Sequence, residues 1–210
     1  MAEREQLQRG LAGLSLTLSE QQQDQLLHYL ALLIKWNRAY NLTAIRDPQE
    51  MVSKHLLDSL SVAPFIRGER LLDVGTGAGL PGIPLAIVYP EKEFELLDAN
   101  SKKTRFLTHV VAELVLTNVK VHHCRIEAGK LGAHYQGILS RAFASLADMT
   151  AACGPLLVEG GELLAMKGQY PEEELSQLPK PYIVKGSHAL VVPGLTGERH
   201  LIRIGPDHTP

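Results

Sequence analysis

The sequence predicts an α/β fold built on one mostly parallel β-sheet with helices on both faces. Two observations lead to this prediction. From residue 70 onward, short apolar strand patterns alternate with helical patterns, and the chain ends in two strand patterns with no helix between them. Alternating strands and helices are typical of a parallel sheet. The closing pair is expected to run antiparallel, through a turn near Leu195 to Gly197.

Length and composition agree with one main domain. The chain has 210 residues, a hydrophobic content of 45% and a formal net charge of −2, so a polyanion would have to be bound by a local patch. Its only two cysteines, Cys124 and Cys153, favour a reducing compartment. The polar N-terminus and the lack of about 20 consecutive apolar residues predict neither a signal peptide nor a membrane span. We therefore expect a cytoplasmic protein with no membrane partner.

Residues 1–68 are expected to form a helical extension that packs on a main domain of residues 69–210. Apolar residues recur at helical spacing over 26–34. Ser19 and Gln22 form a capping-box pattern before this helix.

A second helix start precedes the sheet region. Asp47 is a suitable cap, Pro48 suits the first helical position, and Glu50 would complete a capping box. His55 and Asp58 lie one helical turn apart in this helix. They can be interpreted as a catalytic pair or as a structural hydrogen bond, and spacing alone favours the second.

Seven strands and four helices are expected after the extension. The strands cover residues 70–75, 93–99, 118–124, 137–142, 161–168, 182–194 and 199–205, and the helices cover 82–90, 101–114, 146–157 and 171–178. An antiparallel closing pair is unusual for dinucleotide-binding Rossmann folds. It is typical of the Rossmann-like, seven-stranded fold of class I S-adenosylmethionine-dependent methyltransferases.

The stretch "LLDVGTGAGLPG" is the densest motif. Gly77, Gly79 and Gly82 fit the dinucleotide-binding pattern G-x-G-x-x-G. In a second register, Asp73 is followed by Gly75, Gly77 and Gly79 in the pattern D-x-G-x-G-x-G. A carboxylate at this strand end would repel a pyrophosphate but would favour the cationic S-adenosylmethionine. A turn that needs glycine only for its backbone geometry is the alternative. A dinucleotide and S-adenosylmethionine both contain a ribose, and Asp98, at the end of the next strand, is placed to bind its hydroxyl groups.

Basic residues suggest a local anion site. Lys102, Lys103 and Arg105 lie in the first turns of a helix, where the helix dipole disfavours cations. RNA phosphate would offset that cost, and a solvated helix end is an equal alternative. Further cations follow the third, fourth and fifth strands, whose ends line the ligand crevice of an open sheet: Arg125, Lys130, Arg141 and Lys167.

The side chains outside the glycine loop limit which methyl acceptor the protein could use. "SRAFASL" follows the fourth strand where adenine amino-methyltransferases carry Asn or Asp before Pro-Pro. Both cysteines are interpreted as small buried hydrophobic residues rather than nucleophiles. No metal site is expected, because the adjacent histidines of "VHHC" point to opposite strand faces. An acceptor that is already nucleophilic, such as guanine N7, would need positioning rather than a general base.

"KWNRAYNLT" contains Trp36, Tyr40 and Asn41, which can stack on a base or pin a helix end to the core.

The whole chain resembles the bacterial RsmG family, also called GidB or glucose-inhibited division protein B. The resemblance rests on "KWNRAYNLT", "RDPQEM", "HLLDSL", "LLDVGTGAGLPGIPL", "SRAFASL", "MKGQ" and "GERHL", in this order. It implies transfer of a methyl group from S-adenosylmethionine to N7 of guanine 527, in the decoding-region loop of 16S ribosomal RNA. The product would be S-adenosylhomocysteine.

The resemblance also assigns residues. Gly75 and Leu80 would contact the cofactor, Ile126 and Glu127 would hold its adenine, and Arg141 would lie between cofactor and substrate. The expected partner is 16S RNA or the small ribosomal subunit, with no DNA partner, and the expected state is a monomer. Three alternatives stay open: a nicotinamide-dependent oxidoreductase, a non-catalytic RNA-binding assembly factor, and a small-molecule methyltransferase.

Overall fold

The computed structural model describes residues 2–128, 131–132, 134–141, 143 and 145–207. Its centre is a seven-stranded sheet in the order β3-β2-β1-β4-β5-β7-β6. The first five strands of this order are parallel, and β7 runs antiparallel to both of its neighbours, which confirms the predicted fold class. The strands are β1 (Arg70–Val74), β2 (Glu93–Asp98), β3 (Val119–His123), β4 (Tyr135–Ser140), β5 (Leu157–Lys167), β6 (Tyr182–Ala189) and β7 (His200–Pro206).

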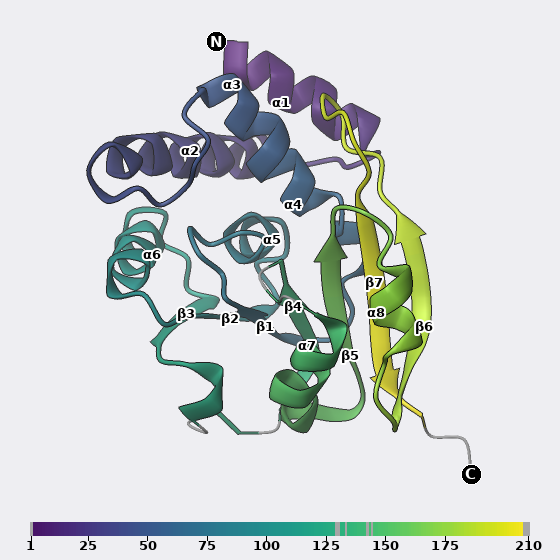
Figure 1. Cartoon of the computed structure of the whole chain (residues 1–210). Coiled ribbons are helices and arrows are strands. Elements are labelled where there is room, and N and C mark those ends of the chain that lie inside the picture. Colours follow the sequence, from purple (N-terminus) through teal and green to yellow (C-terminus); the bar gives the residue numbers. More distant parts are fainter. Residues whose placement is uncertain (1, 129–130, 133, 142, 144, 208–210) are drawn as a thin grey trace.

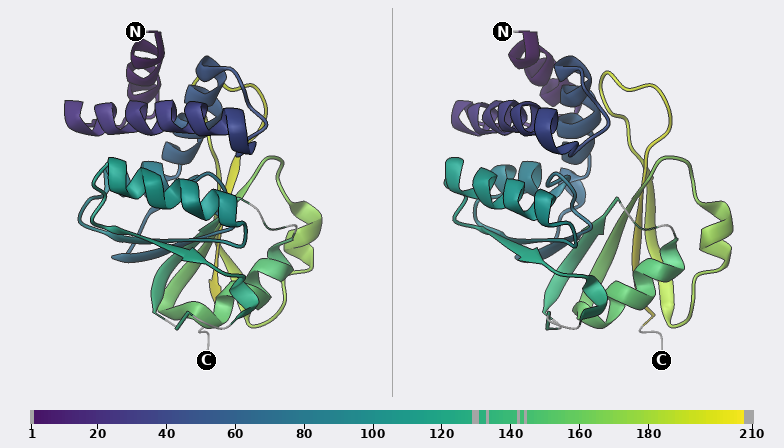
Figure 2. Two further views of the ribbon diagram at one scale, coloured as in Figure 1. Left: turned by 90° about the vertical axis from the view of Figure 1, so that its left-hand side faces the viewer. Right: turned by 60° about the vertical axis from the view of Figure 1, so that its left-hand side comes forward.

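Helices cover both faces of the sheet (Figures 1 and 2). On one face lie α5 (Gly82–Val88) and α6 (Ser101–Glu113), with α2 (Glu20–Tyr40) packed over both of them. On the other face lie α7 (Leu146–Cys153) and the short α8 (Glu172–Ser176). The helical residues before β1 share one hydrophobic cluster with α5 and α6, so this extension and the sheet region have a common core.

The predicted capping box of α2 is formed. The Ser19 hydroxyl accepts from the Gln22 amide N–H at 3.2 Å, and the Gln22 Oε1 accepts from the Ser19 N–H at 3.0 Å. The first helix, α1 (Ala2–Gly13), lay outside the predicted helices because only a few apolar residues mark its buried side, among them Leu7 and Leu11.

The segment before β1 differs from the regular helix that its sequence predicts. Asp47 caps α3 (Pro48–Met51) by accepting from the Gln49 N–H at 2.9 Å, as expected, but Glu50 pairs with Lys54 instead of closing a capping box. A π-helix over Val52–Leu57 follows, and α4 (Asp58–Leu60) continues from it, with a 3-10 turn at Ala63–Phe65. A π-helix has a wider turn than an α-helix, so side-chain directions after Met51 depart from the α-helical pattern.

The closing strands are antiparallel, and the predicted turn lies in the connection between them, where the Leu195 N–H donates to the Val192 carbonyl at 3.1 Å. The strand β5 begins four residues before the predicted start, at Leu157. Among the described residues, no helix combines the length and apolar character needed to cross a bilayer.

Candidate functional site

The glycine loop begins directly after β1, at the carboxyl end of the parallel strands. Gly75, Gly77 and Gly79 have φ angles of 66°, 62° and 95°, a region that favours glycine. The N–H groups of Gly75 and Thr76 both donate to the Leu97 carbonyl of β2, at 2.9 and 3.1 Å. The loop therefore starts at Gly75 and wraps over the ends of two strands.

Asp73 holds this loop from beneath. Its side chain is fully buried, and its Oδ2 accepts from the Thr76 hydroxyl at 2.6 Å and from the Gly82 N–H at 2.8 Å. Burial raises the pKa of Asp73 to about 6, against the opposing effect of these two hydrogen bonds, so the carboxylate is mostly ionised at neutral pH. The sequence predicted Asp73 as a ligand contact. With no exposed surface, it can act on a ligand only through loop shape and charge.

Asp98 links the second strand end to the loop. Its Oδ2 accepts from the Gly77 N–H at 2.9 Å, and its Oδ1 accepts from the Asn100 N–H at 2.8 Å. The Lys103 ammonium lies 3.6 Å from the same Oδ2. The two predicted acids thus support one loop from different sides.

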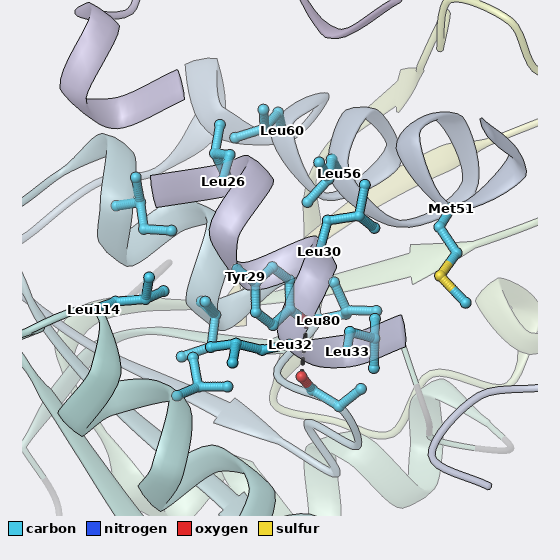
Figure 3. Packing of buried hydrophobic residues seen from close by; sticks show 14 of the residues in the cluster. Leu26, Tyr29, Leu30, Leu32, Leu33, Met51, Leu56, Leu60, Leu80 and Leu114 are labelled. Carbon is cyan, nitrogen blue, oxygen red and sulfur yellow. Dashed lines mark hydrogen bonds between the residues drawn. The ribbon is translucent and has the colours of Figure 1, made fainter. Parts of the chain in front are cut away.

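The N-terminal extension holds the loop from the opposite side. The hydroxyl of Tyr29 on α2 donates to the Ala78 carbonyl at 2.7 Å, and Figure 3 shows this bond within the leucine-rich packing around Tyr29. Tyr29 is fully buried, which raises the pKa of its hydroxyl and keeps it protonated. This contact cannot be predicted from the sequence, because a buried tyrosine on an amphipathic helix carries no motif.

A cavity of about 350 Å³ opens beside the glycine loop. His55 lines it, with Nε2 2.9 Å from the Thr43 hydroxyl and Nδ1 3.1 Å from the Lys54 carbonyl. Burial first, and the positive charge of Arg141 second, lower the pKa of His55 to about 4, so this imidazole is neutral at pH 7. The other lining residues are Leu42, Thr43, Gly75, Thr76, Gly77, Ala78, Leu80 and Arg141.

A second cavity of about 290 Å³ adjoins the first and shares Arg141 with it. Asp58 lines this second cavity and accepts from Arg141 Nη1 at 2.8 Å and from Arg199 Nε at 3.2 Å. The predicted hydrogen bond between His55 and Asp58 is wrong, because the π-helix directs the two side chains into different cavities. The other lining residues are Met166, Lys167, Gly168, Leu190 and His200.

The predicted cations have different surroundings. Lys102 and Arg105 are exposed on α6, and Arg125 is exposed after β3. Lys167 is only 15% exposed, and its ammonium lies 2.8 and 3.0 Å from the two carboxylate oxygens of Glu174. Glu174 thus pairs with Lys167 in the absence of RNA, and the role of Lys167 as an RNA contact stays a prediction. Lys130 lies outside the described residues.

Two other predicted residues lie on a short 3-10 helix, Ile126–Ala128, which follows β3. Ile126 is half-buried and Glu127 is exposed. Neither of them lines the two cavities around Arg141.

The aromatic stretch is structural in this fold. Trp36 packs on Phe106 of α6 and on Tyr40, with ring centroids 5.6 and 5.2 Å apart. Asn41 ends α2 in the left-handed conformation and accepts from Arg46. The interpretation as a helix end pinned to the core is confirmed.

Metal and thiol chemistry find no support among the described residues. His122 binds Glu95 at 2.5 Å, whereas His123 lies 3.2 Å from the Ala99 carbonyl, so the adjacent histidines diverge as predicted. No group of three or more His, Cys, Asp or Glu side chains in the described ranges is arranged for a metal ion. Cys153 is fully buried, and burial raises the pKa of its thiol to about 12.

Solved structures share the fold. The ribosomal protein L11 methylase of Lactobacillus delbrueckii superposes with a TM-score of 0.55 at 16% identity, over 72% of this chain and 77% of that one. The TYW2 protein of P. horikoshii, solved in complex with MeSAdo, gives a TM-score of 0.57 at 12% identity, over 70% of this chain and 60% of that one. These similarities show the fold of class I S-adenosylmethionine-dependent methyltransferases.

Sequence comparisons are more specific. The family model for rRNA small subunit methyltransferase G, GidB, matches residues 22–202. The proteins named ribosomal RNA small subunit methyltransferase G from Marinobacter nauticus and Pseudomonas aeruginosa are 57% and 54% identical to this chain. Each alignment covers 94% of this chain, and they cover 92% and 93% of those proteins. Together with the fold, these matches indicate S-adenosylmethionine as the cofactor. The chain belongs to the rRNA small subunit methyltransferase G family, also called GidB.

Proposed function

We propose that this chain methylates N7 of guanine 527 in the decoding-region loop of 16S ribosomal RNA, with S-adenosylmethionine as methyl donor. The observation that carries the proposal is the pair of adjoining cavities that share Arg141. One lies on the glycine loop and the other beside it, so donor and acceptor can be held next to each other.

The glycine loop fits a cofactor of this size and charge. A Cβ at Gly77 would clash with nothing and would make only ordinary van der Waals contact, with Lys103 Nζ and Gly75 O 3.8 and 4.0 Å away. At Gly79 a Cβ would instead lie 2.6 Å from an Ile83 carbon. The loop is thus packed on its inner side and open toward the cavity, which is the shape that a close ligand requires. The ionised Asp73 beneath it favours a cationic ligand.

We assign the cofactor contacts on this basis. Gly75, Gly77 and Leu80 line the cavity and contact the cofactor, while Gly79, which does not line the cavity, shapes the turn behind them. Asp98 takes the ribose hydroxyls, because its carboxylate can accept more than the two amide hydrogen bonds it already holds. Ile126 and Glu127 hold the adenine, and Arg141 stands between donor and acceptor.

The chain supplies positioning rather than proton transfer. When bound, S-adenosylmethionine provides an electrophilic methyl group and becomes S-adenosylhomocysteine. Guanine N7 attacks with its own lone pair and has no proton to lose, so no general base is needed. This agrees with His55, which lines the cofactor cavity as a neutral imidazole with both nitrogens engaged. In-line alignment of N7 with the methyl group is then the catalytic contribution.

RNA phosphates would bind to the surface cations near the loop. Lys102 and Lys103 lie in the first turn of α6, close to the loop, while Arg105 and Arg125 are exposed farther out. With a net charge of −2, the chain depends on such a local patch. The substrate, 16S RNA or the small subunit, places the reaction in the bacterial cytoplasm.

The test is mass spectrometry of RNA after incubation with the protein and isotopically labelled S-adenosylmethionine. Unmodified 16S RNA and assembled small subunits lacking the modification are treated in parallel. Label on guanine 527 at N7 in either substrate is expected. Label elsewhere would overturn the assigned position.

Three results would favour the alternatives. Turnover of a metabolite without RNA would indicate a small-molecule methyltransferase. RNA binding that survives Gly77→Asp, with no label transferred by the wild type, would indicate an assembly factor. Quenching or enhancement of nicotinamide fluorescence on binding would indicate a nicotinamide-dependent oxidoreductase.

A further inference from the structure

We propose that Asp58 is a positioning residue for the acceptor guanine. Its carboxylate holds Arg141 and Arg199 on two sides of the second cavity, and Arg199 then donates a hydrogen bond to O6 of the base. This proposal rests on the proposed function and extends it, because it names the group that recognises the acceptor and gives the N-terminal extension a part in recognition.

The arrangement joins three segments that are distant in sequence. Asp58 begins α4, Arg141 follows β4, and Arg199 precedes β7. One oxygen of the carboxylate serves each arginine, at 2.8 and 3.2 Å. The Asp58 side chain is only 7% exposed, whereas the arginine side chains are 28% and 33% exposed. The acid is thus hidden behind two cations. Arg199 uses Nε for Asp58 and Nη1 for the Glu198 carbonyl, so Nη2 is the nitrogen that would donate to a base.

The charges of the cavity leave one net positive charge. Asp58 offsets one of its two arginines, and Lys167 is neutralised by Glu174. Met166 and Leu190 add apolar surface to the lining. A planar base with an acceptor edge matches this combination. Guanine presents N7 and O6 as acceptors on one edge, and arginine is the usual partner of that edge. Because N7 must stay free to attack, the hydrogen bond goes to O6.

The fold links this recognition to the transfer step. Arg141 is common to both cavities, and the π-helix before α4 sends His55 into one cavity and Asp58 into the other. π-helical turns recur at functional sites because they re-aim side chains. Asp58 therefore fixes Arg199 relative to Arg141, and with it the acceptor relative to the donor.

The experiment compares two acceptors in two variants. Target RNA is prepared with guanine or with 2-aminopurine, which lacks O6, at the methylated position, in the form that the wild-type enzyme methylates. Single-turnover rates are measured for the wild type, for Asp58→Asn and for Glu162→Gln. Glu162 is the matched control, since it pairs with Arg203 at 2.8 Å between β5 and β7 and lines neither cavity.

The expected result is a loss of discrimination. Asp58→Asn should lower the rate on guanine about tenfold more than the rate on 2-aminopurine, because only guanine has an O6 contact to lose, whereas weaker positioning of Arg141 slows both acceptors alike. For each enzyme, the rate on guanine is divided by the rate on 2-aminopurine. The intrinsic difference in reactivity between the two bases is the same for every enzyme and cancels when these ratios are compared. Glu162→Gln should keep the wild-type ratio. If Asp58→Asn slowed both acceptors equally, its role would be structural and the proposal would be overturned.

Other outcomes are distinguishable. Should Asp58→Asn fail to fold, as judged by thermal unfolding, Arg199→Lys tests the same contact, because it keeps the charge and loses the planar donor group. An unchanged ratio in Arg199→Lys would then overturn the proposal. Absence of methylation by the wild type on guanine would overturn the proposed function and this proposal with it.

Discussion

The glycine loop and the Asp58 ion cluster form the two sides of one site, and they are built in opposite ways. Within the loop, Asp73 bonds to residues three and nine positions away. In the cluster, Asp58 bonds to residues 83 and 141 positions away. The first side is a local motif that its own sequence specifies. The second exists only after the extension, β4 and β7 have come together. If the proposed function is correct, local geometry sets where the donor binds, and long-range packing sets where the acceptor binds.

The largest effect is expected from breaking the local side with Gly77→Asp. An aspartate side chain on this backbone, at φ 62°, would enter the cavity that Gly77 lines and would place a second carboxylate beside Lys103 and Asp98. S-adenosylmethionine affinity, measured by calorimetry, should fall about a hundredfold or more, equivalent to about 3 kcal/mol. The circular dichroism spectrum should stay that of the wild type.

The control is Gly160→Asp. Gly160 also has a positive φ, 75°, and a Cβ there would meet nothing within 4 Å, but it lines neither cavity around Arg141. Affinity should be retained in this variant. Unchanged affinity in Gly77→Asp as well would show that the cofactor binds elsewhere.

Breaking the long-range side with Arg141→Gln should lower kcat/KM about thirtyfold. Loss of the Arg141 guanidinium leaves the buried carboxylate of Asp58 with one arginine and removes the side chain that lines both cavities. Truncating one partner of a buried ion pair costs about 2 kcal/mol or more. Steady-state methylation of RNA measures the effect. A wild-type rate would remove Arg141 from the site.

The surface beside the loop is tested by Lys102→Glu with Lys103→Glu. RNA binding should weaken about tenfold, and the dependence of log Kd on log salt should flatten, because fewer counterions are released. Fluorescence anisotropy at several salt concentrations measures both quantities. Lys167→Gln is the comparison, since Lys167 is already paired with Glu174 and should change the salt dependence little. Identical salt slopes in wild type and double variant would make the α6 lysines a solvated helix end.

A smaller effect is expected from Tyr29→Phe, which tests whether the extension supports the loop. The variant leaves the Ala78 carbonyl without its 2.7 Å hydrogen bond and changes little else. The free energy of unfolding in urea should fall by about 1 kcal/mol, with a loss of cofactor affinity of a few fold. Stability lost without any change in affinity would separate the extension from loop geometry.

The last prediction concerns pH. Because the pKa of folded His55 is lowered to about 4 from its ordinary value of 6.5, the unfolded chain binds the extra proton between these two values. The contribution of His55 to stability is therefore complete above pH 6.5 and is lost as pH falls toward 4. The free energy of unfolding of His55→Gln should fall less steeply over this window than that of the wild type. Parallel curves would mean that His55 keeps its ordinary pKa in the fold.

The sequence by itself determined the parts that depend on neighbours along the chain. The strand and helix order, the capping of α2, the start of the glycine loop at Gly75 and the antiparallel closing pair all follow from short-range spacing, and the structure confirms them. The family resemblance extended this to cofactor and reaction class, because several motifs occur in one order.

Only the tertiary structure decided which side chains meet. In the folded chain, Asp73 is buried beneath the loop and Lys167 pairs with Glu174. A π-helix, which the α-helical sequence pattern does not predict, places His55 and Asp58 in separate cavities. The support of the loop by Tyr29 and the meeting of Asp58 with Arg199 leave no local signal. The physical reason is that a capping or turn preference acts over three or four residues, whereas a hydrogen bond between distant segments has no energy until the core beneath it has packed.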